Sequence, residues 1–182
     1  MGQDKALMEL GGVTLAEIGL GKLCAVCADV AIAGGGSELE RFGRVIPDGT
    51  IPDGTVGCGP LGGIVAALEQ SFFEWNVFLA VDVPLLPVEV LRALLRTAEE
   101  ADVAVMAEAG GQVHPLCGVY ARRALPVLRE ELATGRYKVR SAMEAAGRVS
   151  YVRFEVEEWF RNVNTPEEFR GVVGLVGEGF SF

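Results

Sequence analysis

Two spacings of apolar residues alternate along this chain, one typical of helices and one typical of strands. Over 87–100 the apolar residues recur at helical spacing and share one stripe, formed by Leu91, Leu94, Leu95 and Ala98. Over 76–81 the chain is almost continuously apolar, which suits a strand covered on both faces in a central parallel sheet. Helix-like and strand-like segments in alternation predict an α/β fold.

The same spacings predict the remaining elements. Pro60 opens a predicted helix that runs to Gln70, because proline at the first helical position loses no hydrogen bond. Thr165 and Glu168 have the spacing of a capping box and predict a last helix from Thr165. Further helices are expected over 14–28 with Thr14 as cap, over 37–42 as a single turn, and over 122–133 and 138–146; further strands are expected over 29–33, 43–46, 102–107, 116–120 and 149–154.

Length and composition predict one domain. The 182 residues, half of them hydrophobic, suffice for a core, and we assign 1–171 to the domain and 172–182 to a loose glycine-rich tail. The net charge of −9 argues against nucleic acid as a partner, although a metal ion could still screen an anionic nucleotide. The apolar run before Asp82 is too short to span a membrane, so we expect a cytoplasmic protein without membrane contact.

Cysteine, histidine and glycine motifs exclude several other chemistries. Cys24 and Cys27 lie in a helix-like stretch without a second pair, and ordinary thiols fit better than a zinc site. His114 is the only histidine, and no nucleophile elbow accompanies it. The glycines at 34–36 lack the lysine of a phosphate-binding loop and are interpreted as a turn.

Four polar or glycine-rich segments could carry chemistry. Asp82 follows the apolar strand 76–81, where ligands of open α/β sheets bind; it is either a Mg²⁺ ligand or an ordinary turn residue. Lys5 could reach a phosphate, and the glycines of 57–63 would let a helix N-terminus approach a base or phosphate. Asn162 and Asn164 alternate just before the last helix, as polar ligand contacts would.

In this order, the segments resemble the molybdenum cofactor guanylyltransferases. The resemblance covers nearly the whole chain through MGQDKALMELGGVTLAE, VIPDG, GCGPLGGIVAAL, FLAVDVPLL, HPLCGVYARRALPVL and FRNVNTPEEF. It implies a Rossmann-like nucleotidyltransferase fold with a mostly parallel sheet and helices on both faces. It also implies transfer of GMP from GTP to molybdopterin with release of pyrophosphate, with transient contacts to other cofactor-biosynthesis proteins or molybdoenzymes.

The resemblance also implies roles for individual residues. Lys5 would contact the triphosphate, and Asp82 would hold Mg²⁺. Pro60, Leu61 and Gly62 would line the guanine side, together with an aspartate that reads the base. Because IPDGT occurs twice, at 46–50 and 51–55, that aspartate is either Asp53, which we favour for its spacing, or Asp48. The molybdopterin side would include Asn162, Asn164 and Lys138, the last with Arg136 and Arg140 as alternatives on one solvated face.

The chain departs from the family pattern at its start. Members begin with an apolar strand and a loop like Leu-Ala-Gly-Gly-x-Ser-x-Arg before Met-Gly, whereas Met1-Gly2 stands at the end of that motif here. We therefore expect the first strand to be missing and the true start to lie upstream. The alternatives are a related transferase that uses CTP or a sugar phosphate, or a catalytically impaired nucleotide-binding paralogue.

Overall fold

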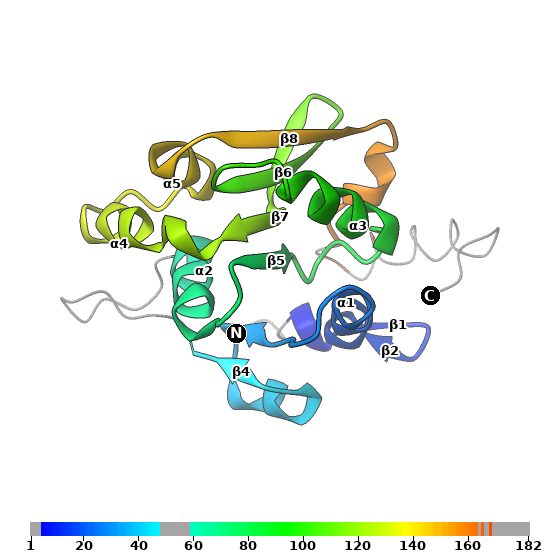
Figure 1. The fold of residues 1–182 in the computed structure, drawn as a ribbon. Coiled ribbons are helices and arrows are strands. Elements are labelled where there is room, and N and C mark those ends of the chain that lie inside the picture. Colours follow the sequence, from blue (N-terminus) through cyan, green and yellow to red (C-terminus); the bar gives the residue numbers. More distant parts are fainter. Residues whose placement is uncertain (1–4, 48–58, 164, 166–167, 169–182) are drawn as a thin grey trace.

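The computed structural model describes residues 5–47, 59–163, 165 and 168. Its largest sheet has four strands in the order β5-β7-β6-β8 (Figure 1). The strands are β5 (Trp75–Leu79), β6 (Ala104–Ala109), β7 (Gln112–Ala121) and β8 (Val149–Phe154). The predicted α/β class is confirmed.

The four-stranded sheet is mixed, where a mostly parallel one was expected. Strand β7 runs antiparallel to both β5 and β6, and only β6 and β8 are parallel. The cause is the turn at Gly110 and Gly111, whose φ values of 57° and 72° suit a two-residue hairpin between β6 and β7. The hairpin was not expected from the sequence, and β7 begins at Gln112 instead of the expected 116.

Helices cover both faces of this sheet, as expected. Strand β6 shows how: Ala104 and Met106 pack into one apolar cluster, while Val105 and Ala107 pack into the other. The first cluster also holds residues of α2 (Gly59–Gln70), α4 (Leu125–Ala133) and α5 (Val139–Ala146). The second holds α3 (Val88–Ala98) and Phe160 of the short helix η4 (Glu157–Phe160). A short turn, η3 (Arg122–Ala124), joins β7 to α4.

The N-terminal part begins with η1 (Lys5–Leu7), a small hairpin of β1 (Glu9–Leu10) and β2 (Val13–Thr14), and helix α1 (Leu15–Cys24). Thr14 caps α1 as predicted: its hydroxyl accepts the N–H of Glu17, and the Glu17 carboxylate accepts the N–H of Thr14. The helix ends at Cys24, four residues before the predicted boundary of 28, and two glycines inside it weaken the helix.

Strands β3 (Ile32–Ala33) and β4 (Val45–Ile46) form a separate, parallel two-stranded sheet on either side of the predicted turn η2 (Ser37–Phe42). Among the described residues neither strand pairs with β5. Every residue of β5 is only partly buried, although we expected a strand covered on both faces. The reason is that, within the described part of the chain, β5 pairs along one edge, with β7.

The C-terminal end is described in part. Thr165 and Glu168 exchange the two hydrogen bonds of a capping box, each 3.1 Å long, which confirms the predicted helix start. The expected tail, 172–182, lies outside the described residues. Within the part of the chain that the structure describes, no helix is long and apolar enough to cross a membrane.

Candidate functional site

The centre of the candidate site is the loop that follows β5. Asp82 lies in this loop, and its carboxylate Oδ2 is 3.8 Å from Nζ of Lys5. About half of the Lys5 side chain and a fifth of the Asp82 side chain are exposed, at 49% and 21%. The structure therefore brings together two predicted residues, and their opposite charges meet at a surface that a ligand can reach.

The segment around Val163 is fixed to the same loop. The N–H of Val163 donates to the carbonyl oxygen of Asp82 at 2.8 Å. The Val163 side chain is fully buried and packs with Leu85 and Met8. Asn162, directly before it, is exposed. Asn162 is thus held beside the Asp82 loop, whereas Asn164 lies outside the described residues.

Lys22 is a component of this region that the sequence analysis missed. Its ammonium, on α1, donates to the carbonyl oxygen of Pro84 in the Asp82 loop. Burial lowers the pKa of Lys22 from 10.5 to about 8. A weak signal was present, because Lys22 is the only basic residue between Lys5 and Arg41 and stands in a helix whose only other charged residue is Glu17.

Two further titratable groups lie on β7, the strand that pairs with β5. Burial, with a smaller contribution from the nearby Asp82 carboxylate, raises the pKa of the Cys117 thiol to about 12. His114 stacks on Phe160, with 4.5 Å between ring centroids, and burial lowers its pKa. Near pH 7 the Cys117 thiol therefore stays protonated, and the lowered pKa of His114 favours its neutral form.

The start of α2 supplies the predicted base-binding segment. Gly59 takes the positive φ of 61° and is exposed together with Pro60, while Leu61 and Gly62 are buried. Gly59 and Pro60 line a groove that also reaches Val81, the residue before Asp82. Of this segment, only the exposed backbone of the first helical turn is open to a ligand. Both candidate aspartates, Asp48 and Asp53, lie outside the described residues.

The basic residues predicted for the molybdopterin phosphate lie elsewhere. Lys138 is exposed and precedes α5, which packs against α4. These helices cover the opposite face of the sheet from α3, and Figure 1 draws them on the left and α3 on the right. Arg136 is bound to the Glu131 carboxylate, with a 2.7 Å hydrogen bond, and Arg140 is bound to Glu144 at 2.8 Å. The structure does not bring these three residues to Asp82.

Comparison with known protein families shows to which family the chain belongs. Residues 1–149 match the family described as the MobA-like NTP transferase domain. The chain belongs to this family. The match spans Lys5, Lys22 and Asp82, and ends before the segment around Val163.

Full-length relatives agree with this membership of the MobA-like family. The chain is 31% identical to a probable molybdenum cofactor guanylyltransferase of Carboxydothermus hydrogenoformans, over 96% of this chain and 89% of the relative. It is 36% identical to a probable molybdenum cofactor guanylyltransferase of Pelotomaculum thermopropionicum, over 92% of this chain and 83% of the relative. The family suggested by the sequence segments is confirmed.

Solved structures confirm the nucleotidyltransferase fold. The molybdopterin-guanine dinucleotide biosynthesis protein A of Archaeoglobus fulgidus superposes with a TM-score of 0.77 at 24% identity, covering 98% of this chain and 93% of that one. The 2-C-methyl-D-erythritol 4-phosphate cytidylyltransferase of Thermus thermophilus superposes with a TM-score of 0.66 at 18% identity, covering 95% and 94%. At these identities the likeness concerns the fold, and members that use different nucleotides share it.

Proposed function

We propose that this MobA-like transferase transfers GMP from GTP to the phosphate of molybdopterin and releases pyrophosphate. The observation that carries the proposal is the meeting of Lys5, Asp82 and the Asn162–Val163 segment at the end of β5. In open α/β sheets this is where ligands bind. The two full-length relatives described above support guanylyl transfer as the specific reaction.

The transfer forms one bond and breaks one. A phosphate oxygen of molybdopterin attacks the α-phosphorus of GTP, and the bond from that phosphorus to the bridging oxygen breaks as pyrophosphate leaves. In such transfers the protein chiefly positions the reactants and offsets charge. Lys5 contributes a positive charge to the triphosphate, and Asn162 contributes a polar contact on the acceptor side.

The donor set around Asp82 fits a Mg²⁺ ion. Mg²⁺ is commonly held by one or two carboxylates plus substrate phosphates and water. Asp82 offers one partly exposed carboxylate, and the described residues contain no cluster of three or more metal-ligating side chains. Bound there, Mg²⁺ would offset the charge of the triphosphate. The N–H of Val163 binds the backbone carbonyl oxygen of Asp82. This hydrogen bond fixes the backbone of Asp82 and so helps to orient its carboxylate toward the ion.

The nucleotide contacts are proposed at the start of α2. Here the exposed start of the helix at Gly59 and Pro60, followed by Leu61 and Gly62, would line the guanine side, with Asp53 or Asp48 reading the base. Calorimetric titration with GTP, CTP and ATP, with and without Mg²⁺, tests this assignment. Mg²⁺-dependent binding that favours GTP supports it, and a preference for CTP overturns the guanylyl part in favour of a cytidylyltransferase.

Pyrophosphate release tests the chemistry. With GTP, molybdopterin and Mg²⁺, we expect Asp82→Asn to lower kcat by roughly 100-fold or more, the scale that removal of one charge-stabilising group usually produces. Asp102→Asn is the matched control, because Asp102 accepts the N–H of Arg148 at the other end of the sheet. Equal rates for Asp82→Asn and the parent chain would exclude Asp82 as the metal ligand.

A further inference from the structure

The loop that carries Asp82 is attached to helix α1 on both sides of that residue. On one side, Val81 packs against an apolar cluster that includes Ile18 of α1. On the other side, the Lys22 ammonium of the same helix donates to the backbone carbonyl oxygen of Pro84. Only two residues of the loop lie between these attachments, and Asp82 is one of them. The backbone at Asp82 therefore depends closely on α1.

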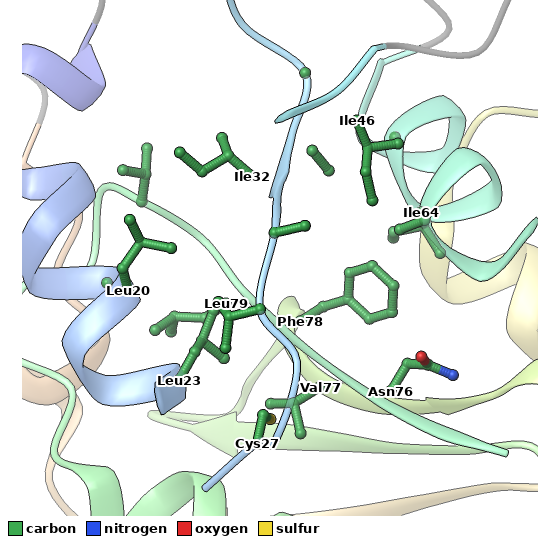
Figure 2. Close-up of a pocket in the computed structure, with 18 of the residues that line it drawn as sticks. Leu20, Leu23, Cys27, Ile32, Ile46, Ile64, Asn76, Val77, Phe78 and Leu79 are labelled. Carbon is green, nitrogen blue, oxygen red and sulfur yellow. The ribbon is translucent and has the colours of Figure 1, made fainter. Parts of the chain in front are cut away.

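Both attachments come from one face of α1. Ile18 and Lys22 are four residues apart, and residues at this spacing share a helix face. The opposite face carries Leu20 and Leu23, which project into the groove between the two sheets (Figure 2). Leu23 also packs in the same apolar cluster as Leu79 of β5. Other side chains thus hold α1 against β5, and the separate task of Lys22 is its contact with the loop.

A lysine is an unusual residue for holding a backbone carbonyl. Its ammonium is strongly hydrated and is rarely taken from water unless it is paired. Lys22 is nevertheless partly buried, and Pro84 is buried. Among the described residues, Lys22 is the only donor to the Pro84 carbonyl oxygen. Such a charge-assisted hydrogen bond is stronger than one between neutral groups, and its loss would leave a buried acceptor unsatisfied.

We propose that Lys22 is a positioning residue for the proposed transfer. By holding the Pro84 carbonyl it fixes the backbone beside Asp82 and keeps the Asp82 carboxylate where it binds Mg²⁺. This ion demands near-ideal octahedral geometry, so a small displacement of the carboxylate weakens the site. Lys22 acts through the loop and not on the substrate, because its ammonium is bound to the Pro84 carbonyl. The inference rests on the proposed function, since that function makes Asp82 the metal ligand.

The first test needs neither metal nor substrate. It follows hydrogen exchange of the Val163 amide, which donates to the Asp82 carbonyl oxygen, in the parent chain and three variants. Lys22→Met has a similar length but no donor, and Lys22→Arg keeps a charged donor. Arg148→Met is the matched control, because Arg148 donates to the carbonyl oxygen of Glu100 near β8, at the opposite edge of the sheet from β5. We expect exchange at Val163 to be roughly tenfold faster in Lys22→Met and close to the parent rate in the other two variants.

The second test measures pyrophosphate release with GTP and molybdopterin over a series of Mg²⁺ concentrations. At pH 7, below the Lys22 pKa of about 8, this lysine carries its proton. Misplacement by about 1 Å can cost about 100-fold in rate, so we expect Lys22→Met to lower kcat by roughly tenfold or more. The Mg²⁺ concentration at half-maximal rate should rise, while the KM for GTP changes little. Lys22→Arg should recover most of the activity, and Arg148→Met should match the parent.

The two tests separate this inference from the proposed function. Parent-like exchange at Val163 in Lys22→Met overturns the inference, even if kcat falls, because Lys22 would then act on the substrate directly. In an active parent, an unchanged kcat and Mg²⁺ requirement in Lys22→Met also overturns it and leaves the proposed function intact. A parent that releases no pyrophosphate overturns the proposed function, and the exchange test still decides whether Lys22 fixes the loop. If Lys22→Met does not fold, Lys22→Gln, whose donor is too short to replace the ammonium, takes its place with the same expected results.

Discussion

At the scale of single residues, the loop after β5 is held by groups from three distant parts of the chain. Lys5 approaches the Asp82 carboxylate, Val163 binds the Asp82 carbonyl, and Lys22 binds the Pro84 carbonyl. Lys5, Asp82 and Asn162 were candidates from the sequence, because the family resemblance assigns them to the triphosphate, to Mg²⁺ and to the molybdopterin side. Lys22 could not be predicted, since its partner is 62 residues away and helical spacing does not reveal which loop a helix faces.

Lys22 links stability to pH. Its pKa is about 8 in the folded chain and near its ordinary value of 10.5 in the unfolded chain. Below pH 8 both states carry the proton, and the full cost of burying the charge is present. Between about 8 and 10.5 the unfolded chain binds more protons, so the free energy of unfolding rises with pH by at most about 1.4 kcal/mol per pH unit.

The Lys22→Met variant lacks this contribution. We expect the free energy of unfolding of the parent, measured in urea at intervals from pH 7 to pH 10, to rise relative to that of the variant. Arginine stays charged over this range, so Lys22→Arg should track the methionine variant in slope. Parallel pH curves for the parent and Lys22→Met would show that the folded pKa of Lys22 is not lowered.

At the scale of elements, the helices were predicted best where capping residues or a proline, close together in sequence, mark the start of the helix. Thr14 and Glu17 begin α1, Pro60 stands in the first turn of α2, and Thr165 and Glu168 form the predicted capping box. The strands were harder, because their pairing is decided by partners far away in sequence. The apolar run of β5 is typical of a strand in the centre of a sheet. The burial of its side chains nevertheless depends on whether its second edge is also paired, which the run itself does not reveal.

The Thr14 cap of α1 should make a measurable contribution to the free energy of unfolding. Thr14→Ala removes the hydroxyl that accepts the N–H of Glu17, and loss of such a cap costs about 1 kcal/mol. Urea denaturation should show this decrease. Thr14→Ser keeps the hydroxyl and should retain most of the stability; a loss equal to that of alanine would assign the effect to the methyl group instead of the cap.

Two glycines of the β6–β7 hairpin should respond differently to substitution. A Cβ at Gly118 would lie 2.9 Å from the backbone oxygen of Val105, so Gly118→Ala forces the paired strands apart. Such overpacking typically costs about 1–3 kcal/mol. Gly111 has a φ of 72° but open space around it, and Gly111→Asn should cost less because asparagine tolerates this conformation. Thermal unfolding of the two variants ranks them; a smaller loss at Gly118 would contradict the tight pairing of β6 and β7.

At the scale of the whole molecule, the described residues form two sheets of unequal stability. The strands β6 and β7 are enclosed by apolar clusters on both faces, whereas β3 and β4 contribute two residues each and pair only with one another in the described part of the chain. Segments with few buried contacts open at lower free energy. The fold class could be predicted from the alternation of helices and strands. The division into two sheets could not, because it depends on a groove between residues that are far apart in sequence.

Hydrogen exchange should therefore separate the two sheets. We expect the amides of Ile32 and Gly34, which donate to the β4 side, to exchange at least about tenfold faster than those of Val105 and Val119. Urea titration of the exchange rates would show the slow amides opening with the whole domain and the fast amides opening alone. Equal rates at both places would instead mean that the chain unfolds as one cooperative unit.

The hydrogen bond from Val163 to Asp82 has a practical consequence for anyone who shortens this protein. The family match stops at residue 149, which invites truncation there. Cutting at that point would remove β8 along with the N–H that holds the Asp82 carbonyl, and it would uncover Leu85 and Met8. A useful minimal version must therefore extend beyond residue 163, so the boundary of the recognisable family and the boundary of a working enzyme differ in this protein.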